Sequence, residues 1–255
     1  MKRIAVFTYG VVAYAVSMAV FLYAVGFIGN FALLKTLDSP ADIPWERALC
    51  IDLALLSLFA AQHSVMARPA FKRMLTRVIP EAAERSTYVL ASSLALMLLF
   101  LQWEPLGGVV WTIESAAGRG VMYAAYAFGW LLVLVSTFVI NHFDLFGLRQ
   151  VWRELRGEPQ ARLRFAVPWL YRVVRHPLYV GWFLTFWSTP DMTVSHLFFA
   201  VATSAYILAA IRFEEADLMK EHPEYGAYRR QVPMLIPGLP REVETAGSGH
   251  WAGLR

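Results

Sequence analysis

The chain contains little charge and only one cysteine. Cys50 is the single cysteine among 255 residues, which excludes an intramolecular disulfide and a cysteine-based metal cluster. Only 16% of the residues are charged, whereas 58% are hydrophobic, and the mean hydropathy is +0.47. Soluble domains carry about 25% charged residues. This composition excludes an ordinary soluble domain and indicates a multi-pass membrane protein.

Several common catalytic motifs are also missing. The chain has no glycine-rich phosphate loop, no G-x-G-x-x-G fingerprint and no G-x-S-x-G nucleophile elbow, so nucleotide hydrolysis and acyl-serine chemistry have no support. It also lacks compact metal-ligand patterns such as H-x-x-x-H or H-E-x-x-H. A metal site is therefore not predicted, although five side chains could bind a metal: His63, His142, His176, Asp144 and Glu214.

Four apolar runs are long enough to cross a bilayer. A helix needs about 20 residues, at about 1.5 Å each, to span roughly 30 Å of hydrocarbon. The four runs are, approximately, Ile4–Ile28, Ala48–Met66, Ser86–Trp103 and Val121–Ile140.

A fifth apolar block, Leu178–Ile211, is interrupted by Ser188-Thr189-Pro190-Asp191. Its first arm of about 12 residues covers only about 18 Å and is too short to cross alone. We therefore expect a helical hairpin that turns near Pro190-Asp191 and returns to the side it entered from; a full crossing is the alternative. The predicted fold is an all-α integral membrane protein with about four transmembrane helices plus a C-terminal helical hairpin, or five to six membrane helices.

Basic residues are unevenly distributed. Twenty of the 23 Lys and Arg residues fall at the N-terminus or in segments 67–85, 142–176 and 212–255. The positive-inside rule then places both termini and both basic loops in the cytoplasm. Loops near anionic lipid explain the net charge of +4, so nucleic-acid binding is not predicted. The apolar run after Met1-Lys2-Arg3 exceeds the 7–15 residues of a signal peptide, which predicts a retained first helix.

Residues 1–239 are expected to form one membrane domain, since the chain shows no internal repeat. Segment 142–176 is basic and interrupted by prolines, and a short amphipathic helix is expected around Leu148–Leu155, lying on the membrane face. The tail, residues 240–255, lacks periodicity and is predicted to be loosely ordered.

Polar residues gather where the predicted spans reach the cytoplasmic face. Segments 62–64, 141–150, 175–181 and 212–215 all map to that face, and their convergence on one cavity is the functional hypothesis. Taken alone, a histidine at a helix end such as His63 is more often an interfacial residue, and it is the company of the other polar segments that favours a function.

The acidic pair Glu214-Glu215 ends the last apolar segment. Adjacent residues on a helix point about 100° apart, so both cannot enter one narrow pocket. We expect one carboxylate to face a ligand and the other to pair nearby, for instance with Arg212 or an arginine of segment 142–176.

Four motifs carry a family resemblance in the last third of the chain. They are Arg175-His176-Pro177-x-Tyr179-x-Gly181, Glu214-Glu215-x-x-Leu218, Tyr225-Gly226-x-Tyr228 and Pro233-x-x-Ile236-Pro237. Residues 170–238 thereby resemble the S-adenosylmethionine-binding half of the isoprenylcysteine carboxyl methyltransferase superfamily. The resemblance implies a cofactor site on the cytoplasmic side. The cofactor-binding residues that it implies are Arg175, His176, Tyr179, Gly181, Glu214 and Glu215.

Residues 1–141 resemble a narrower branch, the nurim-like group. The matching segments are Gln62-His63-Ser64-Val65-Met66-Ala67-Arg68-Pro69, Glu84-Arg85-Ser86-Thr87-Tyr88 and, just beyond, Asn141-His142-Phe143-Asp144-Leu145-Phe146-Gly147. This resemblance implies a bacterial cytoplasmic-membrane enzyme that transfers a methyl group from S-adenosylmethionine to a small volatile thiol, methanethiol, giving dimethyl sulfide. It implies no obligate protein partner.

Such a reaction would need a thiolate, because an ordinary thiol with a pKa near 8.5 is mostly protonated at neutral pH. His63 is the first choice for the base, followed by His142 and Asp144, while Arg149 could help by electrostatic stabilisation of the thiolate. Two alternatives stay open: a different acceptor, such as another small thiol, a prenylcysteine carboxylate or a phospholipid amine, and a non-enzymatic nurim-like membrane protein.

Overall fold

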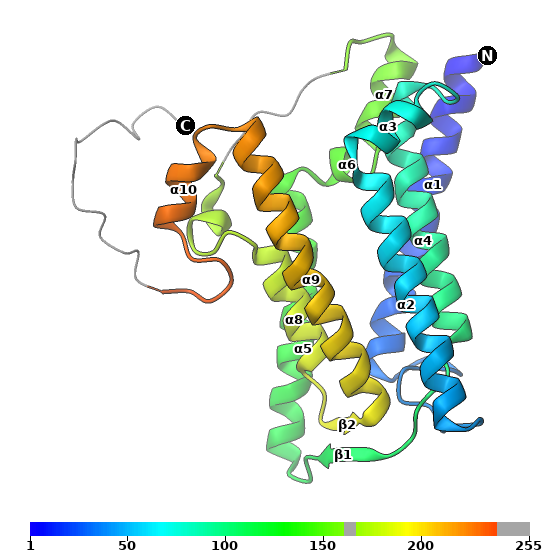
Figure 1. Cartoon of the computed structure of the whole chain (residues 1–255), viewed down its shortest axis with the longest axis vertical. Helices are drawn as coiled ribbons and strands as arrows, with labels where there is room; N and C mark the ends of the chain where they lie inside the picture. The colour runs from blue at the N-terminus through cyan, green and yellow to red at the C-terminus, as the bar shows by residue number, and fades with distance from the viewer. Residues whose placement is uncertain (161–166, 239–255) are drawn as a thin grey trace.

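The computed structural model describes residues 1–160 and 167–238 (Figure 1). Within these residues, five helices are long and apolar enough to cross a membrane. They are α1 (Lys2–Gly29), α2 (Trp45–Ala67), α4 (Glu84–Gln102), α5 (Ala116–Ile140) and α9 (Val194–Glu221). The four runs predicted as spans are confirmed as α1, α2, α4 and α5.

The predicted C-terminal hairpin is also present. Its first arm, α8 (Pro177–Trp187), has only 11 residues, and α9 returns over 28 residues. The turn between them holds a short strand, β2 (Asp191–Thr193), at the expected position. β2 pairs antiparallel with β1 (Val109–Thr112) from the loop between α4 and α5. This two-stranded ladder was not predicted, because its strands are three and four residues long and far apart in the sequence.

The remaining helices are short. They are α3 (Pro69–Leu75), α6 (His142–Leu145), α7 (Leu148–Arg156) and α10 (Tyr225–Gln231), together with the 3-10 turns η1 (Glu81–Ala83) and η2 (Trp169–Arg172). Helix α7 confirms the helix expected around Leu148–Leu155. Figure 1 shows α3, α6, α7 and α10 at the same end as the N-terminus, with the two strands at the other end.

Helices α5 and α8 pack closely because both have a glycine at their contact. A Cβ on Gly181 would lie 2.9 Å from the carbonyl oxygen of Gly129 and 2.7 Å from Cγ2 of Val133. Such distances are shorter than real Cβ contacts, so only glycine fits there. The close approach that Gly181 allows is thus to the backbone of α5, and its role in binding a cofactor stays a prediction.

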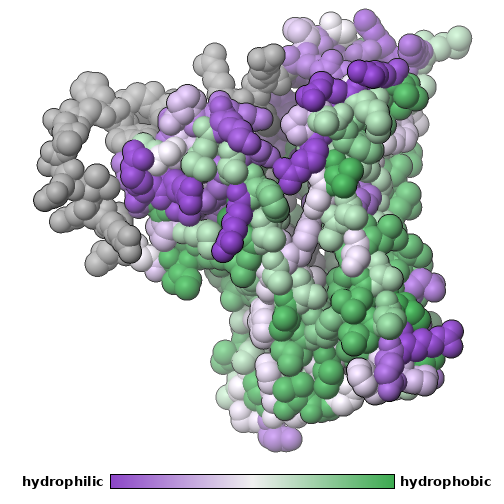
Figure 2. Space-filling model, viewed as in Figure 1, coloured by the Kyte–Doolittle hydropathy of each residue, from purple (hydrophilic) through white to green (hydrophobic). Residues whose placement is uncertain are grey.

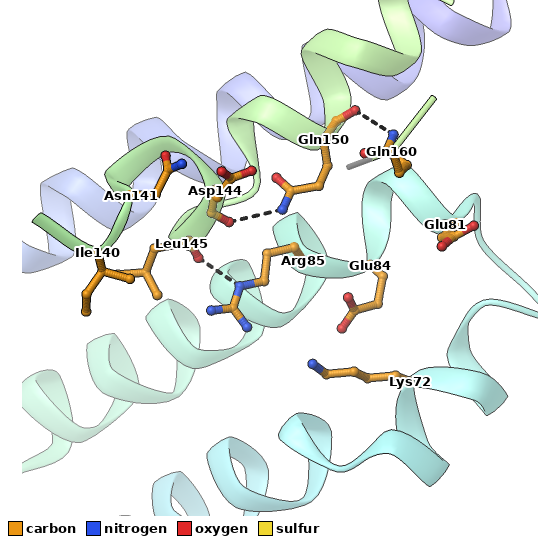
Figure 3. Close-up of a pocket in the computed structure, with 10 residues that line it drawn as sticks. All are labelled: Lys72, Glu81, Glu84, Arg85, Ile140, Asn141, Asp144, Leu145, Gln150 and Gln160. Carbon is orange, nitrogen blue, oxygen red and sulfur yellow. Dashed lines mark hydrogen bonds between the residues drawn. The ribbon is translucent and has the colours of Figure 1, made fainter. Parts of the chain in front are cut away.

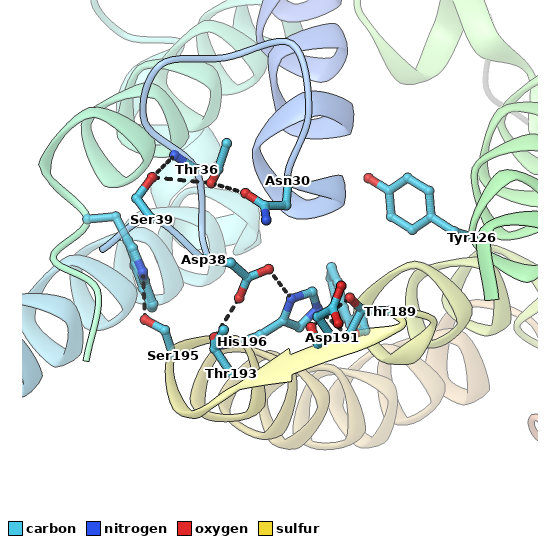
Figure 4. Close-up of polar contacts among 12 residues, drawn as sticks. Asn30, Thr36, Asp38, Ser39, Tyr126, Thr189, Asp191, Thr193, Ser195 and His196 are labelled. Carbon is cyan, nitrogen blue, oxygen red and sulfur yellow. Dashed lines mark hydrogen bonds and ion pairs between the residues drawn. The ribbon is translucent and has the colours of Figure 1, made fainter. Parts of the chain in front are cut away.

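The apolar core lies between α1, α4, α5, α8 and α9, toward the strands. Its largest fully buried side chains include Trp103, Phe27 and Phe100. Next to this core, the imidazole of His196 sits between the Asp38 carboxylate and the Phe186 carbonyl oxygen, 3.0 Å from each (Figure 4). The Thr193 hydroxyl also donates to Asp38. Because these groups come from the loop after α1 and from the α8–α9 hairpin, they tie the two halves of the chain together.

The opposite end of the molecule is polar. In Figure 2, hydrophilic residues cover the end that holds α3, α7 and α10, above a largely hydrophobic flank. The described parts of the basic segments predicted to share one face therefore do lie at one end of the bundle. That this end faces the cytoplasm stays a prediction, and the tail expected to be loosely ordered, residues 240–255, lies outside the described residues.

Candidate active site

His63, near the polar end of α2, is held by side chains of α4. Its Nδ1 lies 3.2 Å from the Ser92 hydroxyl, and the Tyr88 hydroxyl lies 3.0 Å from Nδ1 and 2.9 Å from Nε2. The Phe59 ring stacks on the imidazole with centroids 5.2 Å apart. His63 is thus oriented by two hydroxyl groups inside an aromatic environment, which is the arrangement of a positioned general base.

The last transmembrane helix, α9, closes this environment from the other side. The Tyr206 hydroxyl lies 3.0 Å from the Ser64 hydroxyl, beside Phe59. Tyr179 of α8 lies near both Tyr88 and Tyr206. The His63 environment therefore adjoins Tyr179, one of the residues expected to bind the cofactor, so the two halves of the chain meet there.

Glu215 forms a buried ion-pair cluster. Its Oε1 accepts from Arg175 Nε at 2.7 Å and lies 3.0 Å from His176 Nε2, while its Oε2 lies 3.1 Å from Arg229 Nε. The Glu215 and Arg175 side chains are 6% and 10% exposed. Pairing with basic groups holds the carboxylate in its ionised form despite burial. As expected, one glutamate of the acidic pair bonds to an arginine of segment 142–176.

Glu214 lies on an exposed part of α9 and behaves differently. The Tyr179 hydroxyl donates to its Oε2 at 2.9 Å, and no ion pair to Glu214 is present among the residues that the structure describes. A carboxylate has about four lone-pair sites. Glu214 can therefore accept further hydrogen bonds, whereas Glu215 is already occupied.

The segment before α8 is anchored on the segment after α10. The Arg175 and His176 backbone N–H groups donate to the carbonyl oxygens of Pro233 and Met234, at 2.9 and 3.2 Å. The Tyr228 hydroxyl donates to the Tyr171 carbonyl oxygen at 2.7 Å, and burial raises the pKa of Tyr228 to about 12, so this donor keeps its proton. The tyrosine and proline motifs of residues 225–237 thus support the Arg175-His176 segment.

His142, the second candidate base, lies apart from His63. Its Nε2 is 2.9 Å from the Tyr14 hydroxyl, its Nδ1 is 2.9 Å from the Thr137 hydroxyl, and its ring stacks on Phe138 at 4.2 Å. Burial lowers the pKa of His142, which favours the neutral imidazole. Both ring nitrogens lie within hydrogen-bond distance of hydroxyl groups, one on α1 and one on α5, as both ring nitrogens of His63 do on α4. The role of His142 as a base stays a prediction.

Asp144 and Arg149, the other two candidates for thiol activation, bond to each other. Arg149 donates to Asp144 Oδ2 at 2.8 Å. Neither contacts His63, so the expected convergence on a single cavity is only partial. Within the described residues, no three His, Cys, Asp or Glu side chains come together as a metal site.

A cavity of about 390 Å³ lies between α3, the start of α4 and the α5–α7 connection (Figure 3). Gly147 allows these elements to approach: its φ is +86°, and a Cβ there would lie 2.8 Å from the Ser86 backbone nitrogen. Arg85 joins the cavity to the His63 environment, because its guanidinium lies 5.2 Å from the Tyr88 ring centroid. The lining residues are Lys72, Glu81, Glu84, Arg85, Ile140, Asn141, Asp144, Leu145, Gln150 and Gln160.

Sequence reasoning gave no role to several residues around His63. Tyr88 and Arg85 belong to a recognised motif, and their spacing, with Ser92 one helical turn beyond Tyr88, was a usable signal for one helix face. Tyr206 had a weaker signal, a hydroxyl inside an apolar span. The contact between the Tyr206 and Ser64 hydroxyls depends on how α2 and α9 pack, which no local sequence pattern predicts.

Comparison with known proteins gives close relatives over nearly the whole chain. It is 56% identical over 243 residues to methanethiol S-methyltransferase of Crocosphaera subtropica, covering 95% of each chain. It is 47% identical to methanethiol S-methyltransferase of Mycobacterium tuberculosis, over 93% of this chain and 98% of that protein. Nurim of Xenopus laevis is 28% identical over 84% of this chain and 78% of that protein. No family model and no solved structure matches.

Proposed function

The chain belongs to the family of the methanethiol S-methyltransferases, and on that premise we propose that it is a membrane enzyme that methylates methanethiol with S-adenosylmethionine as the donor. The observation that carries the proposal is the environment of His63, in which a hydroxyl-bonded imidazole lies beside the segment expected to bind the donor. The products are dimethyl sulfide and S-adenosylhomocysteine.

The residues around Tyr179 suit the donor. S-adenosylmethionine supplies an activated methyl group on a sulfonium, and it also carries an ammonium group and a ribose diol, both hydrogen-bond donors. Glu214 is exposed and, within the described residues, accepts a hydrogen bond from Tyr179 alone, so it has the free acceptor capacity that such groups require. Arg175, His176 and Glu215 bond to one another, and their role is to hold the Tyr179 and Glu214 segments in place. Gly181 contributes by fixing α8 against α5.

His63 takes the proton of the thiol. Methyl transfer needs a thiolate, and a neutral imidazole positioned by hydroxyl groups is the group best placed to accept the proton at a ring nitrogen. The proton moves from sulfur to His63, leaving a thiolate and an imidazolium.

The aromatic surroundings favour a small apolar acceptor. Phe59 and Tyr88 contact the His63 ring, and Tyr206 of α9 contacts Phe59. Such a lining would exclude water and leave little room for a bulky thiol. Exclusion of water also favours alignment of the two reactants, which in favourable cases contributes roughly 7–11 kcal/mol to lowering the barrier.

The proposed location is a bacterial cytoplasmic membrane with the site open to the cytoplasm. The basic segments lie at the same end of the bundle as the site (Figures 1 and 2), and the positive-inside rule assigns that end to the cytoplasm. Both termini would then be cytoplasmic.

The test is headspace gas chromatography of the purified protein in detergent, supplied with S-adenosylmethionine and methanethiol. We expect dimethyl sulfide above a no-enzyme control. A bulky thiol such as benzenethiol should give little of its methylated product, methyl phenyl sulfide. If calorimetry shows that the donor binds but no dimethyl sulfide forms, the protein is a methyltransferase for an acceptor other than methanethiol. Absence of both binding and product would favour a non-enzymatic role in the manner of a membrane scaffold.

A further inference from the structure

The cavity beside Arg85 has charged and polar groups that lack partners in the part of the chain that the structure describes. Its Lys72 forms no ion pair or side-chain hydrogen bond within the described residues. Glu84 Oε1 and Gln150 Oε1 are buried there without a hydrogen-bond partner. Buried polar atoms normally have partners, so these atoms mark a place where a ligand would complete the bonding.

The charges in this cavity are of both signs and face one space. Figure 3 shows the Lys72 ammonium, the Glu84 carboxylate and the Arg85 guanidinium pointing toward the same opening. Arg85 donates through Nε to the Leu145 carbonyl oxygen at 2.8 Å, which orients its terminal nitrogens and leaves them available. An anionic group would bind at Lys72 and Arg85, and an adjacent cationic group would bind at Glu84.

The ligand chemistry that fits is an ammonium group next to an anionic group. We propose that this cavity binds the α-amino-acid end, ammonium and carboxylate, of S-adenosylmethionine and S-adenosylhomocysteine. The inference rests on the proposed function and adds a second part to its donor site, formed by the N-terminal half of the chain.

The position of Arg85 supports this assignment. Its guanidinium lies over the Tyr88 ring, 5.2 Å from the centroid, and the Tyr88 hydroxyl lies 2.9 Å from His63 Nε2. In the donor a short carbon chain separates the sulfonium from the carboxylate. A carboxylate at Arg85 would therefore leave the sulfonium near Tyr88, between His63 and Tyr179.

Lipid headgroups such as phosphatidylethanolamine carry the same pair of charges, so the experiment must distinguish the donor's amino-acid end from a lipid headgroup.

The experiment compares two ligands in each variant by calorimetry, with the full-length protein in phosphatidylcholine nanodiscs. S-adenosylhomocysteine has the amino-acid end and 5′-methylthioadenosine lacks it. We expect the wild type to bind the first at least about tenfold more tightly, as hydrogen bonds to charged groups allow. Glu84→Gln and Lys72→Gln should each reduce that ratio by about tenfold without changing the affinity for 5′-methylthioadenosine. Glu158→Gln, an exposed carboxylate outside the cavity, is the control and should leave both affinities unchanged.

Three results would overturn the inference. The ratio of the affinities for S-adenosylhomocysteine and 5′-methylthioadenosine could be the same in the Glu84 and Lys72 variants as in the wild type. The variants could also lose affinity for both ligands equally. Alternatively, native mass spectrometry could show that these variants lose bound phosphatidylethanolamine while the ligand ratio stays constant, which would assign the cavity to a lipid. If the wild type binds both ligands equally, only this inference fails; if it binds neither, the proposed function fails with it.

Discussion

The strand end and the polar end of the molecule use their buried polar groups differently. At the strand end, most of these groups bond to one another: Asp38 to His196 and Thr193, and Ser195 to the Trp103 indole and the Leu106 backbone N–H. Asp52 accepts from the Glu104 backbone N–H through Oδ1, and only its Oδ2 lacks a partner there within the described residues. At the polar end, Glu84 Oε1, Gln150 Oε1 and Lys72 have no bonded partner within the described residues.

This difference separates anchoring from binding. Bonded groups at the strand end tie the α8–α9 hairpin and the loop after α1 to each other and to the core. Groups left available at the polar end can bond to a ligand. The polar end also contains side chains that are fully paired: the Glu215 carboxylate is held by Arg175 and Arg229.

The largest effect is expected from the base. His63→Gln should lower the rate of dimethyl sulfide formation by about 10²–10⁴-fold, the usual contribution of a general base, while changing the affinity for S-adenosylhomocysteine less than twofold. Gas chromatography and calorimetry on the same preparation measure the two quantities. The control is His142→Gln, because the ring nitrogens of His142 already bond to Tyr14 and Thr137. If His142→Gln lost as much rate as His63→Gln, the assignment of the base to His63 would be contradicted.

The next largest effect concerns the strand end. Asp38→Ala leaves His196 buried without its carboxylate partner, and breaking a buried pair costs about 3 kcal/mol. For a chain of this size, that corresponds to a fall in thermal midpoint of about 6–12 °C. Activity per folded molecule should be retained, because this cluster lies at the end opposite His63. Asp42→Asn, an exposed position on the same loop, is the control. A catalytic loss in Asp38→Ala at full stability would contradict the proposed division of roles.

A smaller effect is expected at the polar end. Glu214→Gln keeps an acceptor for Tyr179 but removes the charge, so the affinity for S-adenosylhomocysteine should fall by about tenfold, the value of a charge-assisted hydrogen bond. The rate at saturating donor should change little. Glu221→Gln, exposed further along α9, should have no effect. An unchanged affinity for S-adenosylhomocysteine in Glu214→Gln would show that the donor does not contact the Glu214 carboxylate.

The smallest effect is a dependence of stability on pH. Burial lowers the pKa of His142, so at acidic pH the unfolded chain binds more protons than the folded one. The stabilisation is complete above about pH 6.5 and is lost as the pH falls below that value toward the folded pKa. Thermal midpoints at pH 7.5 and pH 5.5 should therefore differ more for the wild type than for His142→Gln. Equal differences would show that other groups control acid stability.

Individual residues show which predictions the sequence could support. The α1, α2, α4 and α5 spans followed from length and hydropathy, and the hairpin followed from the four polar residues that interrupt Leu178–Ile211. The arginine partner of one glutamate followed from helix geometry, because Glu214 and Glu215 point about 100° apart. Which glutamate would pair depended on where Arg175 and Arg229 arrive after folding.

Other features had no local signal. Strand β1 is four residues long and pairs with a segment about 80 positions later, so its hydrogen bonds depend on the meeting of two loops. The separation of His142 from His63 is similar. His63 lies in the last turns of α2 and His142 begins α6 just after α5, and only the packing of the helices gives them different neighbours, Tyr14 for His142 and Tyr88 for His63.

The sequence by itself determined the membrane class, the number of long helices, the face that holds the basic segments and the family motifs, because each follows from composition, run length or short spacing. The tertiary structure decided which polar groups meet: His63 with Tyr88, Glu215 with Arg175, and Lys72 with Glu84 and Arg85 around one cavity. The physical reason is that a side-chain contact depends on the relative rotation and distance of helices far apart in the chain, and those are set by packing that no single helix specifies.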